Sequence, residues 1–282
     1  MTATPTRELD STPNLTVLFG KAVLTGFTRH GSALPSTVYS RSPLAVDPGH
    51  LSAYNKVCGF RLTDQLPITY PHVLGFPLQV KLMTDNDFPF PLVGSVHIAN
   101  RITQLRPLHT TDVLRVQVHV ENLRDHAKGR QFDMVTTVFA GDSVTWHSTS
   151  TYLRRTGSGG SSADKDVVVR QPGAVWSVPD DIGRRYAEVA GDRNPIHLHP
   201  LAAKLFGFPR AIAHGMWTKA RCLAAFEGRL PEAYTVDVKF KLPVLLPAKA
   251  GFTTDRADDG WSFELFNARN GKPHLTGEIT SA

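Results

Sequence analysis

Polar side chains that can exchange protons gather between residues 186 and 200, a stretch that reads YAEVAGDRNPIHLHP. Four of them fall within eight residues: Asp192, Asn194, His197 and His199. A carboxylate and an imidazole that share one cleft can take a proton from one atom of a substrate and deliver one to another. The same side chains could instead bind a metal ion, or could simply cap the backbone of a polar loop. The neighbouring sequence has to discriminate between these three interpretations.

The residues around this stretch predict a sharp corner in the chain. The segment before Gly191 has helical spacing, and this glycine is a plausible C-terminal stop. Asn194 followed by proline is typical of a cap and the first position of a new turn. Asp192 and His197 then lie on either side of a corner, which can aim both into one cleft, whereas a straight helix would splay them. The alternative is that Asp192 and Asn194 only cap exposed amides, and spacing alone does not choose between the two.

A metal site and a nucleophilic centre are both disfavoured. His197, His199 and His214 could supply imidazoles, but their spacing matches no zinc motif and no thiolate accompanies them. No serine lies in a G-x-S-x-G motif, and Cys222 falls on an apolar helix, where a buried structural thiol is the common role. We therefore expect neither a metal ion nor another cofactor. His199 and His214 are interpreted as structural or supporting residues.

Composition places the chain among soluble globular proteins. It has 282 residues, 41% of them hydrophobic and 20% charged, enough for two ordinary domains or one large one. The N-terminus lacks the basic start and apolar core of a signal peptide, and the richest apolar run near it is too short to span a bilayer. Two cysteines are too few for a disulfide framework, so the cytoplasm is the expected location.

The charge pattern narrows the possible partners. The net charge of +6 comes from scattered basic residues, and no nucleic-acid-binding module is recognisable, so we expect no nucleic-acid partner. A mildly positive balance equally suits a small polyanionic ligand such as coenzyme A.

Two short motifs recur along the chain. YNKVCGFR begins at Tyr54, and the similar YAEVAGDR begins at Tyr186. GFP occurs at Gly75 and again at Gly207, and these glycines are as far apart along the chain as the two tyrosines. Two matches at one separation, with glycines in both, indicate that the chain contains two copies of one fold.

A change of composition marks the boundary between the copies. Residues 154–166, RRTGSGGSSADKD, are rich in Gly and Ser and have nothing apolar to bury, which predicts a flexible linker. We therefore expect an N-terminal copy over residues 1–153 and a C-terminal copy over residues 167–282.

Each half has its helical signal in its earlier part and strands after it. Alternating apolar and polar residues predict antiparallel strands with one buried face over residues 93–102, 112–122, 131–153, 234–244, 248–258 and 261–280. The clearest helix is 215–228, which carries an apolar stripe. A long helix followed by strands is typical of an α+β half-domain whose sheet wraps around the helix. Two such halves could pair into one continuous sheet.

The first half is predicted to lack most of that long helix. Its strand at Val96 matches the strand at Val236, and these two valines are further apart along the chain than the repeated glycines are. The difference indicates that the first half is shorter between GFP and the strand, by a little over two helical turns. The segment at this place, TDNDFPFPLVG, contains prolines that cannot continue a helix. We expect an apolar trough there, lined by Phe88, Phe90 and Leu92, unless the segment folds inward and fills the space.

The motif G-D-x-N-P-I-H resembles the signature of the MaoC-like or R-specific enoyl-CoA hydratases, also called hydratase 2. An aromatic residue precedes its glycine by five positions, and AIAHGM follows downstream. The resemblance is specific through residues 186–216 and extends to the whole chain as a double hot-dog layout, most like the actinobacterial (3R)-hydroxyacyl-thioester dehydratases. It implies reversible hydration of a trans-2-enoyl thioester of coenzyme A or acyl carrier protein in fatty-acid metabolism. The enzyme would be a monomeric double hot-dog or a homodimer.

The same resemblance implies a role for each residue of the motif. Asp192 and His197 would be the catalytic pair. Gly215 would give a backbone N–H to the thioester carbonyl, where negative charge develops in the transition state. The supporting residues would be Asn194, which braces the corner, Tyr186 and His214.

At the separation set by the two tyrosines, the first half carries none of the chemical groups. The residues at the positions of the aspartate, histidine and glycine are Phe60, Gln65 and Met83. One active site per chain and a catalytically degenerate first half would follow. A hot-dog thioesterase and a non-catalytic acyl-thioester-binding or assembly subunit are the rival functions that the sequence leaves open.

Overall fold

The computed structural model describes residues 5–25, 31–92, 94–155 and 171–282. Its helices are α1 (Leu15–Thr25), α2 (Pro48–Cys58), α3 (Tyr70–Met83), α4 (Ile182–Ala190), α5 (Pro195–Leu198), α6 (Pro200–Leu205) and α7 (Gly215–Ala224). The strands of the first half are β1 (Thr6–Glu8), β2 (Val38–Leu44), β3 (Ser95–Gln104), β4 (Leu114–His126), β5 (Gly129–Ala140) and β6 (Ser143–Arg155). Those of the second half are β7 (Ala174–Val178), β8 (Tyr234–Phe240), β9 (Ala248–Ala257), β10 (Gly260–Asn267) and β11 (Pro273–Ser281).

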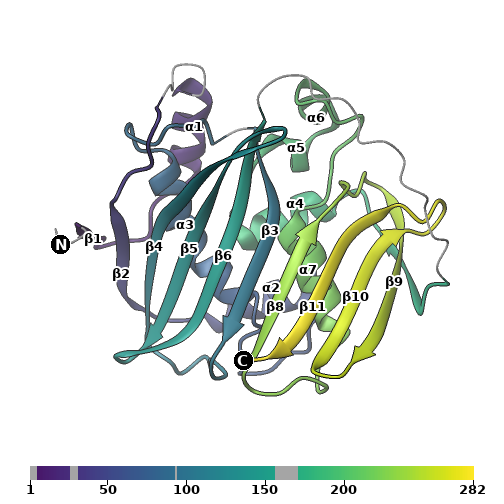
Figure 1. Cartoon of the computed structure of the whole chain (residues 1–282). Coiled ribbons are helices and arrows are strands. Elements are labelled where there is room, and N and C mark those ends of the chain that lie inside the picture. The colour runs from purple at the N-terminus through teal and green to yellow at the C-terminus, as the bar shows by residue number, and fades with distance from the viewer. Residues whose placement is uncertain (1–4, 26–30, 93, 156–170) are drawn as a thin grey trace.

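The strands of the described residues form one continuous sheet in the order β1-β2-β4-β5-β6-β3-β8-β11-β10-β9-β7 (Figure 1). Only the pairing of β1 with β2 is parallel among the described strands. The two halves of the sheet repeat one strand order. The first half has the order β2-β4-β5-β6-β3, and the second half, read from its own edge toward the centre, has the equivalent order β7-β9-β10-β11-β8. The halves are therefore two copies of one topology, joined where β3 pairs antiparallel with β8, with Ile102 opposite Val236.

Each half wraps its sheet around one helix. The first-half helix α3 packs against β4 and β5, and the second-half helix α7 packs against β10, because both helices bury apolar side chains against the concave face of the sheet. Figure 1 shows the helices gathered behind the sheet. The α+β double hot-dog expected from the sequence is confirmed by this arrangement.

The expected strands correspond to β3–β6 and β8–β11, whereas β2 and β7 escaped prediction. Both lie at or next to a sheet edge. The first contains Arg41 and Pro43, and the second has only five residues. Edge strands need no strict alternation because one side of the strand is not fully covered, and this weakens their signal in the sequence.

Of the two repeated motifs, only the first marks equivalent structure. Tyr54 lies on α2 and Tyr186 on α4, and both helices end at a glycine with left-handed backbone, Gly59 at φ 84° and Gly191 at φ 72°. The GFP match is wrong. Gly75 lies inside α3, whereas Gly207 has φ 82° in the turn after α6. The two glycines adopt different backbone conformations, so the recurrence is coincidental.

The prediction that the long helix is shortened in the first half is therefore also wrong. Helix α3 has 14 residues and α7 has 10. Pro77 lies inside α3, and the burial of most of this helix offsets the backbone hydrogen bond that a proline removes. The extra residues of the second half instead form α5 and α6, before its long helix. Met83 accordingly ends α3 and is no counterpart of Gly215, and Gln65 is exposed and bridges to His109.

The segment expected to leave a trough fills space in the core instead. Phe88 and Phe90 are 1% and 8% exposed, and their ring centroids lie 5.3 Å and 5.7 Å from that of Phe132. Removal of apolar rings from water lowers the free energy of the chain, and the proline-rich segment therefore folds inward. Leu92 alone of the three expected lining residues faces the cavity described below.

The boundary between the halves is described only in part. Strand β6 continues through Arg155, and residues 156–166 of the expected linker lie outside the described residues. Across the described ranges, no helix is long and apolar enough to cross a membrane.

Candidate active site

The predicted corner is present between α4 and α5. Gly191 ends α4, and its N–H donates to the carbonyl of Ala187. Asn194 caps α5 and its side-chain oxygen accepts from the N–H of Ile196 at 3.4 Å. The chain therefore leaves one helix and begins another between Asp192 and His197, as their spacing around a glycine and a proline predicted.

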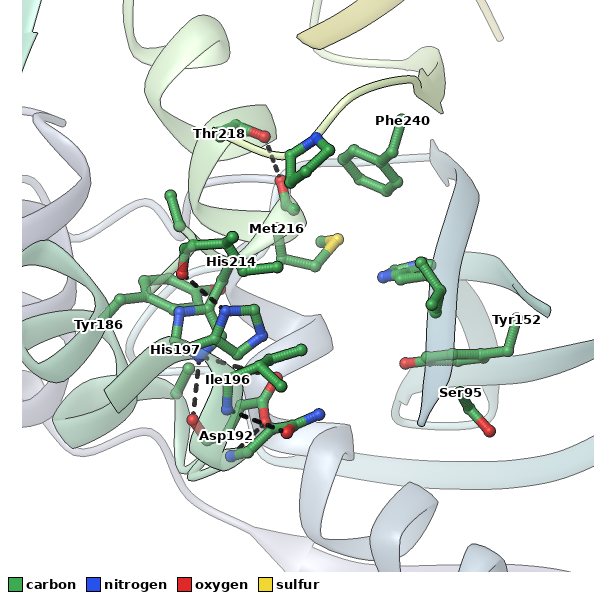
Figure 2. Close-up of a pocket in the computed structure, with 18 of the residues that line it drawn as sticks. Ser95, Tyr152, Tyr186, Asp192, Ile196, His197, His214, Met216, Thr218 and Phe240 are labelled. Carbon is green, nitrogen blue, oxygen red and sulfur yellow. Dashed lines mark hydrogen bonds and ion pairs between the residues drawn. The ribbon is translucent and has the colours of Figure 1, made fainter. Parts of the chain in front are cut away.

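The corner brings Asp192 and His197 together with His214, the residue before α7. One carboxylate or ring-nitrogen atom from each of the three lies within 4.8 Å of the others. The rings of His197 and His214 stack, with centroids 3.7 Å apart and planes at 26°. Figure 2 shows these side chains on one wall of a cavity, with Tyr152 and Ser95 on the other side. Spacing alone did not predict the part of His214 in this cluster.

Backbone carbonyls fix the orientation of both imidazoles. Nδ1 of His197 lies 2.8 Å from the carbonyl oxygen of Ile212, and Nε2 of His214 lies 3.0 Å from that of Asp192. A carbonyl can only accept, so each of these ring nitrogens carries a hydrogen. In the neutral ring of His197, Nε2 is therefore left with its lone pair, as a general base requires.

The carboxylate of Asp192 also has a structural contact. Its Oδ1 accepts from the backbone N–H of Asn194 at 3.1 Å, and its Oδ2 lies 3.8 Å from Nε2 of His214. Oδ1 of Asp192 therefore caps a backbone N–H, the role that the sequence spacing could not exclude. The other oxygen has no backbone N–H partner in the described residues, and it belongs to the same cluster as the ring of His197.

Burial shifts the pKa values of the pair toward each other. Desolvation raises the pKa of Asp192 above its ordinary value, while the charge of His197 and the N–H of Asn194 act in the opposite sense. Desolvation lowers the pKa of His197, opposed by Asp192. It also lowers the pKa of His214 well below its ordinary value, so this ring is neutral at neutral pH. Both groups of the pair therefore exchange protons more readily with each other than an exposed Asp and His would.

Tyr186 and Gly215 complete this wall of the cavity. The ring of Tyr186 lies 4.9 Å from that of His214 and supports it from α4. Gly215 is the first residue of α7, whose first backbone N–H groups have no partner within the helix. A Cβ at this glycine would lie 3.1 Å from Cε1 of Phe240, so a larger residue would press on that ring. The glycine keeps the start of α7 accessible.

The cluster of Asp192, His197 and His214 has the composition of a metal site but not its geometry. Ligand imidazoles must direct lone pairs from their ring planes to one point. The two rings here stack nearly parallel, and one nitrogen of each already donates to a carbonyl. His199 lies outside the cluster, exposed, and its Nδ1 accepts from the N–H of Leu201 at the start of α6. The arrangement favours proton transfer over metal binding.

The first half contributes the opposite wall of the cavity, whose volume is about 200 Å³. His97 and Tyr152 are paired residues on β3 and β6, with ring centroids 4.7 Å apart, and His72 lies 6.2 Å from His97. Burial lowers the pKa of His72 to about 3 and that of His97 well below its ordinary value, so both rings are neutral. No sequence pattern pointed to these three residues, because the face of a strand that meets a cavity depends on sheet register.

The fold and this site define a class of protein, and comparison with known proteins identifies the same class. Residues 161–276 match the MaoC like domain. The chain is 45% identical to 3-hydroxyacyl-thioester dehydratase X of Mycobacterium tuberculosis over 251 residues, which are 87% of this chain and 90% of that protein. The chain therefore belongs to the MaoC-like dehydratase family.

The comparison with solved structures supports the same family assignment. The crystal structure of HtdX of Mycobacterium tuberculosis has a TM-score of 0.80 and 43% identity, and the match covers 87% of this chain and all of that one. A MaoC-like dehydratase from Phytophthora capsici has a TM-score of 0.69 at 20% identity, covering 87% of this chain and 94% of that chain, which shows the shared fold alone.

Proposed function

We propose that the protein reversibly adds water to a trans-2-enoyl thioester, giving a (3R)-3-hydroxyacyl thioester, in fatty-acid metabolism. The observation that carries this proposal is the Asp192–His197 pair at the wall of a cavity, with Nε2 of His197 free to accept a proton. The name of the M. tuberculosis relative, a 3-hydroxyacyl-thioester dehydratase, supports the same reaction. We also propose that the enzyme works in the cytoplasm.

Hydration requires two proton movements on either side of one carbon–carbon bond. One group of the pair takes a proton from water as the oxygen bonds to C3, and the pair then passes that proton to C2. Asp192 and His197 act as a coupled pair around one water, since each pKa depends on the other. In the reverse direction the same groups remove the proton from C2 and protonate the departing hydroxyl.

Negative charge develops on the thioester oxygen while C2 is still carbanionic. The N–H of Gly215, at the positive end of the α7 dipole, stabilises this charge. Hydrogen bonds of this kind contribute several kcal/mol in a site that excludes water, on the order of a hundredfold in rate for one donor. Tyr186 and His214 hold the pair in place, and Asn194 holds the corner.

The first half, residues 1–153, supplies a wall of the cavity, and its described residues form no catalytic pair of their own. Phe60 follows Gly59 as Asp192 follows Gly191, so a phenyl ring occupies the position of the acid. Its ring lies 6.4 Å from that of Tyr54 and packs into the first half. The C-terminal half, residues 167–282, carries the single active site of the chain.

A direct assay tests this function. The protein is incubated with crotonyl-CoA and with a longer trans-2-enoyl-CoA, while loss of the conjugated thioester absorbance and release of free thiol are followed together. Hydration removes the absorbance without thiol release. Thiol release would identify a thioesterase, and absence of both changes would identify a non-catalytic acyl-thioester-binding protein.

A further inference from the structure

Three polar side chains on the first-half wall of the cavity have no part in the proposed hydration. They are His72 in the first turn of α3, His97 on β3 and Tyr152 on β6, and all three line the cavity of the Asp192–His197 pair. The ring centroid of His97 lies 4.7 Å from that of Tyr152 and 6.2 Å from that of His72. We call these three residues the polar wall cluster. A few polar groups in a largely apolar cavity commonly fix the orientation of a ligand.

A bulge in β3 turns part of this cluster toward the cavity. The register of β3 against β6 shifts between His97 and Ala99, and the pairing of β3 with β8 begins at Ala99. Consecutive side chains of a regular strand point to opposite faces of the sheet, whereas His97 and Ile98 both line the cavity here. Bulges next to active sites change the direction of a side chain. The position of His97 is therefore set by the sheet itself.

Two ring nitrogens of the cluster are buried without a hydrogen-bond partner in the described part of the chain. They are Nε2 of His97 and Nδ1 of His72. Folding removes such an atom from water, and the lost hydrogen bond costs free energy unless another partner replaces it. A purely aliphatic ligand would leave both nitrogens unpaired, whereas a ligand with a polar group at this place would satisfy at least one.

The backbone next to His97 decides which kind of partner its unpaired nitrogen needs. Burial lowers the pKa of His97, and a backbone hydrogen bond with Ala99 acts in the opposite sense. Only an acceptor raises the pKa of an imidazole in this way, so the carbonyl of Ala99 accepts a hydrogen from the ring. Because Nε2 has no partner, this hydrogen is on Nδ1, and Nε2 of the neutral ring keeps its lone pair. Nε2 therefore needs a donor.

A hydroxyl group is the ligand group that fits this arrangement best. It can donate to Nε2 of His97 and accept from the hydroxyl of Tyr152, which points into the cavity (Figure 2). A ketone, an ether or a carboxylate offers Nε2 no donor, and an ammonium group would lose its hydration beside two neutral rings. Val73 and Leu92 line the same wall, so the hydroxyl would be attached to an apolar chain.

We propose that the polar wall cluster binds a hydroxyl group carried by the acyl chain, beyond the reacting C2–C3 bond, and that the protein prefers hydroxylated enoyl thioesters. This inference rests on the proposed function, which supplies the thioester and places its double bond at the Asp192–His197 pair. Tyr152 lies on the wall opposite that pair (Figure 2). The hydroxyl therefore belongs to the part of the chain after C4, and it is a different group from the hydroxyl that hydration adds at C3.

Binding is tested first, with saturated thioesters that the protein cannot hydrate. Calorimetric titration of the full-length chain compares octanoyl-CoA with its 5-, 6-, 7- and 8-hydroxy derivatives. We expect at least one hydroxylated ligand to bind about tenfold more tightly than octanoyl-CoA, because it pairs a buried atom that octanoyl-CoA leaves unpaired. The derivative that binds most tightly gives the place of the cluster along the chain. Equal or weaker binding of every hydroxylated ligand would overturn the proposal.

Substitution then assigns the preference to the cluster. The ratio of the dissociation constant of octanoyl-CoA to that of the tightest hydroxylated ligand should fall about tenfold in His97→Phe. This variant keeps an aromatic ring beside Tyr152 and removes both ring nitrogens. Tyr152→Phe, which removes only the phenolic hydroxyl, should lower the ratio in the same sense.

The control is His147→Phe, at an exposed histidine of β6 that does not line the cavity. Its ratio of dissociation constants should equal that of the parent. An unchanged ratio in His97→Phe would mean that water satisfies the ring nitrogen, and this result would overturn the proposal.

Kinetics test whether the preference acts on the reaction. For trans-2-octenoyl-CoA, kcat/KM of the form hydroxylated at the same carbon, divided by kcat/KM of the plain form, should exceed one in the parent. The quotient should fall about tenfold in His97→Phe and stay unchanged in His147→Phe. An equal loss for both substrates in His97→Phe would mean that the cluster contacts a part common to both, such as the pantetheine arm, and would overturn the assignment.

Failure of the cluster and failure of the proposed reaction have different signatures. If the hydroxylated ligand binds more tightly to the parent and loses this advantage in His97→Phe, but no enoyl thioester is hydrated, the cluster stands and the reaction is wrong. If both enoyl thioesters are hydrated and their quotient does not respond to His97→Phe, the reaction stands and the cluster is wrong.

Discussion

At the scale of single residues, the proposed active site depends on two side chains that a turn of the backbone brings together. His197 is held by the carbonyl of Ile212, and Asp192 by the N–H of Asn194, so each keeps one atom for the substrate. Near-isosteric substitution should remove the proton transfer and leave the packing. We expect Asp192→Asn and His197→Gln each to lower kcat for crotonyl-CoA by at least about a hundredfold.

The matched control for this prediction is His199→Gln. His199 is exposed outside the cavity, and the turnover of this variant should stay within a few-fold of the parent. The midpoint of urea unfolding, measured for all three variants, checks that they fold. Near-normal turnover in either variant of the pair would show that the pair is assigned wrongly.

The pKa shifts of the pair predict where activity is lost on the acid side. In the proposed hydration, one water supplies both the hydroxyl and the proton, so the reaction should begin with an unprotonated His197 and an ionised Asp192. Because the pKa of His197 is lowered and that of Asp192 is raised, protonation that abolishes activity should occur between their ordinary values, about 3.9 and about 6.5. A profile of log kcat/KM from about pH 4.5 to pH 8 should therefore be flat above about pH 6.5 and fall below it. A fall that begins above that value would contradict the shifts.

At the scale of elements, α3 and the segment that follows it shape the first-half wall of the cavity. Val73 and Phe76 on α3 and Leu92 after it line the cavity, whereas Phe88 and Phe90 fill the core. We propose that an acyl chain lies along this wall, because the wall is apolar and faces the catalytic pair. Each buried methylene of the acyl chain should strengthen the binding free energy by at most about 0.8 kcal/mol.

A bulky residue at this wall should therefore shorten the accepted chain. In the parent, kcat/KM should rise from the four-carbon enoyl-CoA to longer ones until the wall is covered. In Leu92→Trp the rise should stop at a shorter chain, with the four-carbon substrate little affected. Leu62→Trp, at a leucine that is 75% exposed, is the control. The measurement is kcat/KM for enoyl-CoA substrates of increasing chain length, made with the parent, Leu92→Trp and Leu62→Trp. The same dependence on chain length in Leu92→Trp as in the parent would show that the acyl chain lies elsewhere.

At the scale of the whole molecule, a buried lysine joins the halves. Lys219 of α7 is fully buried, and its Nζ donates to the side-chain and backbone oxygens of Asn100 on β3 at 2.6 Å and 3.0 Å. It also donates to the carbonyl of Val236 on β8 at 3.2 Å. The side-chain amide of Asn100 continues the network to the hydroxyls of Ser148 and Ser150. A helix of the second half is thereby fixed to the pair of strands that joins the two halves of the sheet.

Removal of this donor should destabilise the chain as a whole. Lys219→Met keeps the length of the side chain but leaves the buried oxygen of Asn100 without its donor, at a cost of about 1–3 kcal/mol in unfolding free energy. Urea unfolding followed by circular dichroism measures the loss. Lys239→Met, at an exposed lysine of the adjacent strand, should change the unfolding free energy by less than about 0.5 kcal/mol. Equal stability of the two variants would mean that Lys219 contributes no net stabilisation.

The sequence by itself predicted the corner between Asp192 and His197 and most of the fold. A glycine that ends a helix, an asparagine that caps the next one and a proline in its first turn act within a few residues of Asp192 and His197, so their effect does not depend on distant contacts. Strict alternation likewise marked the central strands, because their buried and exposed faces differ along the whole strand. The duplication was visible at the helix that precedes the corner.

Only the tertiary structure decided which distant residues meet that corner. The separation between Tyr54 and Tyr186 relates equivalent residues only as far as the end of their helices, because α5 and α6 are inserted in the second half. Carried further, the same separation pairs Met83 with Gly215 wrongly. Strand register placed His97 and Tyr152 in the cavity. Such surfaces depend on how strands and turns far apart in the chain pack together, and no local pattern encodes that packing.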